Sequence, residues 1–208
     1  EEMELLRDAK DLASVEVLPN HLTLAAPECY ERLKGFAQQN PPVREQRHQD
    51  ALWRALNAGI VDVLATDHAP HTREEKERPY PASPSGMPGV QTMVPVMLTH
   101  VNNGKLTLQR FVELTSAGPQ RVFGLADKGR IAEGYHADFT VVDLKRKETI
   151  TEEWSKSKCG WTPYDGFEAT GWPVATIIRG GFVMRDGEIV KKGGGQPVRF
   201  NETLEPMG

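Results

Sequence analysis

Cysteine is scarce in this sequence, which contains only Cys29 and Cys159 among its 208 residues. The two lie too far apart for a finger-type zinc site, and two cysteines are too few for a disulfide scaffold. Cysteines of this kind stay reduced in the cytoplasm. We therefore expect two free thiols and a cytoplasmic protein.

Long apolar runs and an excess of basic charge are also missing. No stretch approaches the about 20 apolar residues needed to span a bilayer, and no signal peptide opens the chain. The net charge is −4, and no basic stripe is interleaved with aromatic residues, which argues against nucleic-acid and membrane partners. With 38% hydrophobic and 26% charged residues, the composition is typical of a soluble globular protein.

An initiator methionine is absent as well. Position 1 is Glu, and the opening E-E-M-E-L-L-R-D-A-K already has the pattern of a charged helix. No internal repeat occurs along the chain. We interpret the given sequence as beginning within a domain.

What the sequence does contain is centred on Val61–Thr72, which reads V-D-V-L-A-T-D-H-A-P-H-T. The apolar first half predicts a short buried strand, and Asp67, His68 and His71 follow where that strand emerges. In α/β barrels the catalytic groups lie at the carboxyl ends of the strands. The pattern therefore indicates a metal or proton-transfer site, although an Asp-His pair after a strand is also typical of an ordinary turn.

The surrounding elements predict an α/β fold. A strand at Val15–Val17, a helix at His48–Asn57 and the strand at Val61 follow one another, which is the order of a parallel sheet with crossover helices. Further helices are expected at Val90–Val101 and at Thr107–Phe123, the latter capped by Thr107 and ended near Gly124. After Gly129 the chain becomes β-rich, with a hairpin turn at Asp186-Gly187. We expect three regions: 1–128, a β-rich appendage over 129–192, and a tail over 193–208.

The loop Arg73–Pro88 joins the central strand to the next helix and is long enough to serve an active site. It contains S-G-M-P-G at Ser85–Gly89, whose glycines permit a close backbone approach to a ligand. An ordinary Gly/Pro turn is the alternative. The charge run Glu74–Arg78 is most simply a solvated face.

At this point the sequence resembles the dihydroorotases of the amidohydrolase superfamily. The resemblance rests on V-L-P-N-H-L-T-L, N-P-P-V-R, V-L-A-T-D-H-A-P-H-T and S-G-M-P-G-V-Q-T, in the order of the family, and it covers nearly all of Val15–Val190. It extends through G-P-Q-R-V-F-G-L and K-G-R-I-A-E-G-Y-H-A-D, the latter shared across the superfamily. Asn20 departs from the pattern, because the family commonly has His there. We take Asn20 and His21 as packing or supporting residues.

The resemblance implies the C-terminal portion of a (β/α)₈ TIM-type barrel with a small β-sandwich appendage. The strands at Val15–Val17 and Val61–Ala65 would be the seventh and eighth of the barrel. Earlier strands would carry the H-x-H pair, a bridging carboxylate or carboxylated lysine, and two further histidine ligands. The sequence contains no H-x-H. One or two zinc ions are implied, with most ligands outside this chain.

The same resemblance assigns roles to individual residues. Asp67 matches the aspartate that touches the metal and acts as general base and acid. Asn40 and His71 match residues that bind substrate, while Ser85 and Gly86 lie in a loop that offers backbone groups to it. His68 matches a residue near the metal that is not a usual ligand. Asn40 as a turn residue and His71 as a surface histidine are the simpler alternatives.

The implied reaction is the reversible interconversion of dihydroorotate and N-carbamoyl-L-aspartate in pyrimidine synthesis. Allantoinase and hydantoinase are alternatives with the same metal chemistry, and a non-catalytic subunit that supports aspartate transcarbamoylase is another. The implied partners are the N-terminal half of the same protein or a second copy of the chain, because two strands by themselves are marginally stable. Without such a partner we expect several apolar side chains to face water: Val61, Val63, Leu64, Met93, Val94 and Met97.

Overall fold

The structure is a computed structural model that describes residues 2–201. Its helices are α1 (Glu2–Asp8), α2 (Pro19–Thr23), α3 (Glu28–Leu33), η1 (Lys34–Ala37), α4 (Gln46–Asn57), α5 (Arg73–Lys76), α6 (Met93–Asn102), α7 (Leu108–Val112), η2 (Glu113–Ala117) and α8 (Gly118–Phe123). Its strands are β1 (Glu16–Val17), β2 (Val63–Leu64), β3 (Phe139–Thr149), β4 (Glu168–Ile178), β5 (Gly181–Arg185) and β6 (Glu188–Ile189). No helix among these residues is long and apolar enough to cross a membrane.

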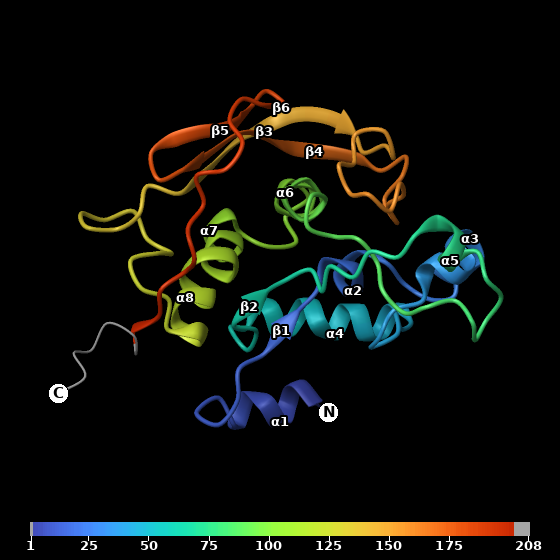
Figure 1. Ribbon diagram of the computed structural model, residues 1–208. Coiled ribbons are helices and arrows are strands. Elements are labelled where there is room, and N and C mark those ends of the chain that lie inside the picture. The colour runs from blue at the N-terminus through green and yellow to red at the C-terminus, as the bar shows by residue number, and fades with distance from the viewer. Residues whose placement is uncertain (1, 202–208) are drawn as a thin grey trace.

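The two short strands β1 and β2 form the centre of the first half of the chain. They pair in parallel, with Glu16 opposite Val63 and Val17 opposite Leu64, as the order of elements predicted. Figure 1 shows α4, the crossover helix between them, running alongside the pair. Trp53 and Leu56 of α4 belong to the same buried cluster as Val17 and Leu64. Within the described residues the sheet has only these two strands, so the outer edge of each pairs with no third strand.

The expectation that apolar side chains of this region face water is wrong for most of them. Val61, Val63 and Leu64 are only 1%, 5% and 3% exposed, and Met97 is fully buried. Met93 and Val94 are half-buried and pack against the same cluster. The cover comes from α6 and from the helices after Thr107, which bury these side chains within the chain itself.

The segment from Thr107 to Gly124 is helical throughout, as predicted. The Thr107 hydroxyl accepts a hydrogen bond from the Arg110 amide at 3.1 Å, and Gly124 ends the helix with φ 61°. The middle of the segment, η2, is a π-helix, which the sequence did not indicate. Gly118, the residue just after η2, lies very close to the residue that precedes β2. A Cβ on Gly118 would stand 2.1 Å from the Asp62 carbonyl oxygen. Only glycine fits this contact.

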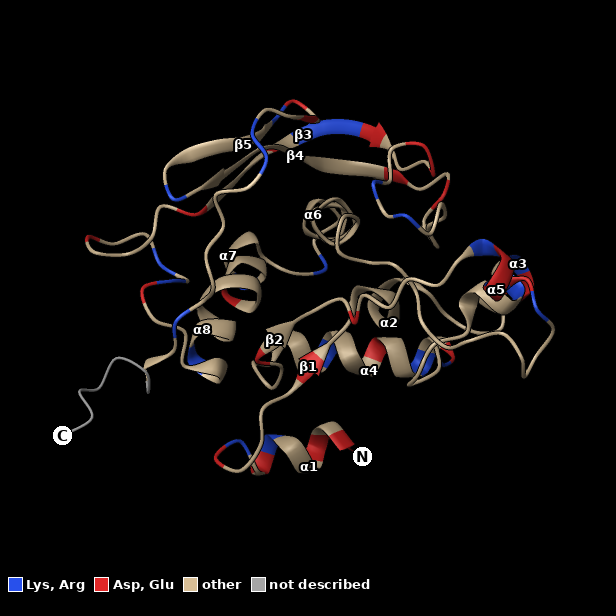
Figure 2. Cartoon of the chain, in the orientation of Figure 1, with Lys and Arg blue, Asp and Glu red and all other residues tan. Residues whose placement is uncertain are grey.

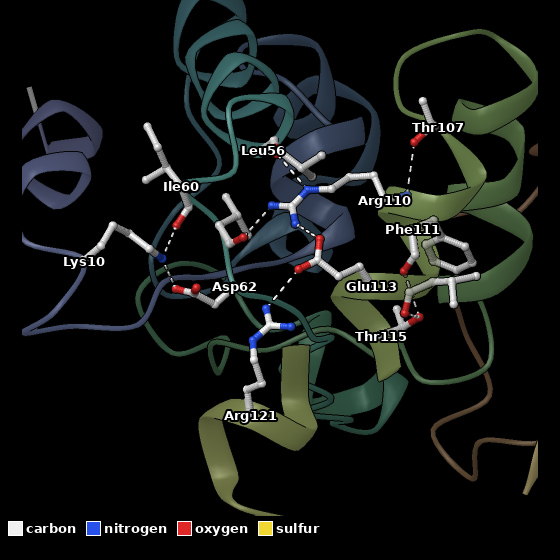
Figure 3. Close-up of polar contacts among 12 residues, drawn as sticks. Lys10, Leu56, Ile60, Asp62, Thr107, Arg110, Phe111, Glu113, Thr115 and Arg121 are labelled. Carbon is white, nitrogen blue, oxygen red and sulfur yellow. Dashed lines mark hydrogen bonds and ion pairs between the residues drawn. The ribbon is translucent and has the colours of Figure 1, made fainter. Parts of the chain in front are cut away.

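Arg110 anchors this helix to the amino-terminal side of β2 (Figure 3). Its guanidinium donates to the Leu56 carbonyl at 3.0 Å and to the Val61 carbonyl, and it pairs with Glu113. Glu113 also pairs with Arg121 at 2.9 Å. Burial would raise the pKa of Glu113, but the hydrogen bonds from Arg121 and Arg110 outweigh burial and lower it. The network stabilises the end of β2 opposite to Asp67.

The second half of the chain is an antiparallel sheet of order β3-β4-β5-β6, lying over α6 (Figure 1). The side-chain amide of Asn102, in α6, donates to the Leu144 and Thr170 carbonyls at 3.1 Å and 2.9 Å. These hydrogen bonds hold the sheet against the helix. The predicted hairpin turn is confirmed, with φ 49° at Asp186 and 86° at Gly187. A second sheet layer, which a β-sandwich would need, is not present among residues 2–201.

Part of the expected tail pairs with the body of the protein. The Ala126 amide donates to the Arg199 carbonyl at 2.9 Å, and the Asn201 amide donates to the Gly124 carbonyl at 2.8 Å. These bonds satisfy backbone groups just beyond α8. The remainder of the expected tail, residues 202–208, lies outside the described residues.

His100 of α6 gives a testable pH dependence of stability. Burial, with a smaller contribution from Lys105, lowers the pKa of His100 to about 4. Its ring packs on Trp53, and its Nε2 lies 2.9 Å from the Thr23 hydroxyl. The unfolded chain binds this proton near pH 6.5 and the folded chain only near pH 4, so the free energy of unfolding should fall by up to about 3 kcal/mol as the pH drops from 6.5 to 4.

The measurement is urea unfolding between pH 4 and pH 8. His100→Gln should flatten that part of the profile, since glutamine carries no titrating proton. His48→Gln, at an exposed histidine of α4, is the matched control and should retain the wild-type slope. An unchanged slope in His100→Gln would contradict the assignment.

Candidate functional site

Asp67 stands three residues beyond the carboxyl end of β2, in a left-handed backbone conformation with φ 45°. Aspartate is one of the few residues that tolerate this region, and such conformations cluster at functional sites. The side chain is exposed and forms no hydrogen bond with any residue from 2 to 201. The strand therefore presents a carboxylate with open acceptor positions at its carboxyl end.

His68, the next residue, is held by the backbone. Its Nδ1 accepts hydrogen bonds from the Gly89 amide at 3.0 Å and the Val90 amide at 3.3 Å. A neutral ring that accepts at Nδ1 carries its proton on Nε2, so neither nitrogen has a free lone pair for a metal. His68 thus joins the end of β2 to the start of the loop leading into α6.

His71 contacts the S-G-M-P-G segment. Its Nε2 donates to the Ser85 carbonyl at 3.0 Å, and its Nδ1 lies 3.8 Å from the Glu75 carboxylate. The Trp161 indole N–H donates to the His71 carbonyl at 2.8 Å. The side chain remains 32% exposed.

Gly86 makes this contact possible. It has φ 140°, and a Cβ there would stand 2.6 Å from the Ala69 carbonyl oxygen. The sequence led us to expect a close approach to a ligand, whereas in the structure this glycine closely approaches the D-H-A-P-H backbone. The Gly86 amide donates to the Gln38 carbonyl at 2.9 Å, which adds a third segment to the assembly.

Asn40 belongs to that third segment. It lies two residues after Gln38, whose side-chain amide reaches the Ser85 hydroxyl at 3.5 Å. Asn40 is exposed, and its side chain forms no hydrogen bond within the described part of the chain. The fold thus gathers the backbones that carry all five predicted residues: Asp67, His71, Asn40, Ser85 and Gly86.

Behind these segments lies a buried polar chain. Asn20, 3% exposed, donates to the Gln39 side chain at 2.9 Å and accepts from the Tyr164 hydroxyl at 2.8 Å. The Gln39 amide in turn lies 2.7 Å from His21 Nε2. Burial raises the pKa of Tyr164, which keeps its hydroxyl a donor. Asn20 and His21 are supporting residues, as expected, but the sequence did not point to Gln39.

The interpretation of Glu74–Arg78 as a wholly solvated charge run is wrong. Lys76 is completely buried, on a helix, α5, that begins with a reciprocal capping box between Thr72 and Glu75. Figure 2 shows acidic and basic residues of α5 side by side. The T-x-x-E pattern at Thr72–Glu75 is the sequence signal that would have predicted this helix start.

The described residues do not form a complete metal centre. No group of three or more His, Cys, Asp and Glu side chains within residues 2–201 is placed to hold an ion. Asp67 alone has an open carboxylate in the expected position. A catalytic zinc site typically has three protein ligands, more than the single open carboxylate found here.

A hollow of about 860 Å³ lies among α3, η1 and α5 and is not the candidate site. Its lining includes Tyr30, Phe36, Lys76 and Tyr80, and it includes neither Asp67 nor His71. We place the site at the convergence of the three segments, because the open polar side chains lie there.

The chain is an α/β protein in which helices cover a pair of parallel strands. Its candidate site lies at the carboxyl end of one of these strands, where the Asp67 carboxylate is exposed. The chain belongs to the amidohydrolase family, whose model matches residues 2–190.

Two comparisons refine this likeness. The chain is 41% identical over 197 residues to the dihydroorotase of Pyrococcus furiosus and 40% identical over 187 residues to that of Methanosarcina acetivorans. These matches cover 94% and 89% of this chain but 45% and 40% of the relatives, so the chain spans less than half their length. Among solved structures, L-hydantoinase from Arthrobacter aurescens matches with a TM-score of 0.87 and 32% identity, over 91% of this chain and 44% of that one.

Proposed function

We propose that this chain is the part of a dihydroorotase that carries the proton-transferring aspartate and much of the substrate site. The reaction is the reversible hydrolysis of the cyclic amide dihydroorotate to N-carbamoyl-L-aspartate in pyrimidine synthesis. The observation that carries the proposal is the open Asp67 carboxylate at the carboxyl end of β2. About 40% identity to dihydroorotases, over about nine-tenths of the chain, supports the choice of substrate.

Hydrolysis of a cyclic amide needs an activated water, a polarised carbonyl and a proton for the leaving nitrogen. A divalent metal, which we propose is zinc, supplies the first two when bound, by lowering the pKa of water and acting as a Lewis acid. Asp67 then takes the proton from the water and returns it to the ring nitrogen. Asp67 would also be a ligand of that metal, and the remaining ligands would lie outside this chain.

The other residues hold the substrate. Asn40 can donate and accept at once, which suits the amide edge of the ring. His71, when cationic, would favour the exocyclic carboxylate, and the backbone at Ser85 and Gly86 would contact the substrate from the opposite loop. The open Asn40 side chain and the half-exposed His71 ring support these roles.

The architecture we propose is the end of a (β/α)₈ barrel over residues 1–128, an appendage over 129–192 that forms one layer of a β-sandwich, and a terminal segment over 193–208. The outer edges of β1 and β2, which pair with no third strand among residues 2–201, support it, because free strand edges favour pairing with further strands. The partner would be the rest of the same protein or a second copy. Aspartate transcarbamoylase is a further candidate partner.

A substrate panel on the full-length protein tests the function. Dihydroorotate, hydantoin and allantoin would each be supplied with zinc, and products followed by chromatography. We expect kcat/KM for dihydroorotate to exceed the others. Hydantoinase is the second candidate, favoured by the structural likeness to hydantoinases at TM-scores of 0.87 and 0.85. Preferred hydrolysis of hydantoin would establish it.

His71→Ala and Asn40→Ala should weaken substrate binding in the full-length enzyme more than they weaken metal binding. His71→Ala removes a hydrogen bond to a charged group, worth roughly 1.5–3 kcal/mol, which corresponds to about a tenfold or greater rise in KM. Asn40→Ala removes a hydrogen bond to a neutral amide, worth roughly 0.5–1.5 kcal/mol, which corresponds to a rise of about two- to tenfold. KM and metal content would be measured side by side. His48→Ala and Asn103→Ala, at exposed positions, are the matched controls. Lost metal with unchanged KM would reassign both residues as metal ligands or supports.

A further inference from the structure

We propose that Lys76 is a positioning residue for substrate binding, which clamps the Ser85-Gly86 loop to the Gln38–Asn40 segment. Its ammonium group donates to the Gln38 carbonyl at 2.9 Å and to the Pro84 carbonyl at 2.7 Å. The first acceptor lies two residues before Asn40 and the second immediately before Ser85. One side chain thus spans the two segments that the proposed function, on which this inference rests, assigns to substrate.

The surroundings show that this contact is built into the fold. Lys76 is fully buried, and it forms no ion pair with any carboxylate of residues 2–201. Its Nζ lies 5.8 Å from the centre of the Trp161 ring, which is itself 1% exposed. Burial lowers the pKa of Lys76 to about 8. Burying a lysine without a counter-charge is costly. Within the described part of the chain its hydrogen-bond acceptors are two backbone carbonyls, which indicates that the ammonium group has a specific positioning role.

Neighbouring hydrogen bonds connect Lys76 to the proposed substrate site. The Gln38 carbonyl accepts from the Gly86 amide as well as from Lys76, so both donors meet on one oxygen. The Ser83 hydroxyl donates to the Lys76 carbonyl at 3.2 Å, which closes the loop on α5. Loss of the ammonium leaves the Pro84 carbonyl without its donor and loosens Ser85 and Gly86 relative to Asn40.

The test uses Lys76→Met in the full-length protein, with Lys145→Met on exposed β3 as the matched control. We expect KM for dihydroorotate to rise about tenfold with kcat within about threefold, as for loss of a charged hydrogen bond that acts on binding. Amide exchange in residues 83–89 should accelerate by about the same factor. Lys76→Gln keeps two N–H donors on a shorter stem and should restore part of both effects. Lys145→Met should leave both unchanged.

Two results would overturn the proposal: wild-type KM with wild-type exchange in Lys76→Met, or a change in melting temperature alone. If Lys76→Met does not fold, Lys76→Gln decides by the same two measurements. Acetylation of native wild-type protein, read by mass spectrometry, needs no variant. Lys76 should be protected relative to Lys145, and equal labelling would refute the clamp. If wild type does not hydrolyse dihydroorotate, the proposed function fails, while exchange in residues 83–89 still tests Lys76.

Discussion

Asp67→Asn is expected to lower kcat of the full-length enzyme by about 10²–10⁴-fold, the usual contribution of general acid–base catalysis. The amide keeps the size and hydrogen-bonding reach of the carboxylate but cannot take a proton from water and return it to nitrogen. The left-handed backbone should accept the change, because asparagine tolerates that conformation as well as aspartate. Folding should therefore be preserved while turnover is lost.

The experiment measures kcat, KM and metal content together, with Asp11→Asn at an exposed position as the matched control. KM should change little, since the proposed function assigns substrate binding to Asn40, His71 and the Ser85-Gly86 loop and not to Asp67. A variant that retains near wild-type kcat would show that another group carries the proton. A variant that loses its metal as well as its activity would make Asp67 chiefly a ligand.

The 208-residue chain by itself should show no dihydroorotase activity. Within residues 2–201 no group of three or more His, Cys, Asp and Glu side chains can hold an ion, and catalytic zinc is held by several protein ligands. In the proposed mechanism the metal activates the water and polarises the carbonyl, so without it Asp67 would have no nucleophile to deprotonate. The rate of hydrolysis should equal the uncatalysed rate in buffer alone.

The assay compares the purified chain, with zinc added, against the full-length protein under the same conditions. Adding the remainder of the protein as a separate polypeptide should restore activity if the two parts assemble. Hydrolysis of dihydroorotate by the isolated chain at an ordinary enzymatic rate would contradict the expectation that most metal ligands lie outside this chain. It would mean that a second copy of this chain completes the site.

The local elements could be read from the sequence because their signals are local. Thr107 and Gly124 marked the two ends of a long helix through a cap and a left-handed glycine, and Asp186-Gly187 marked a turn. The alternation of β1, α4 and β2 gave the parallel pairing, since a crossover helix returns the chain in the same direction. The π-helix at Glu113–Ala117 had no such signal in the sequence.

The candidate site divides in the same way. The sequence by itself determined that Asp67 follows a buried strand and that Gly86 permits a close approach. Only the tertiary structure decided that Gly86 approaches Ala69, that His68 accepts from backbone amides, and that Lys76 is buried. A run of consecutive charged residues such as Glu74–Arg78 predicts a solvent-exposed segment when only the sequence is considered. Burial and hydrogen-bond partners depend on segments far apart in the chain, and those distances are set by the fold.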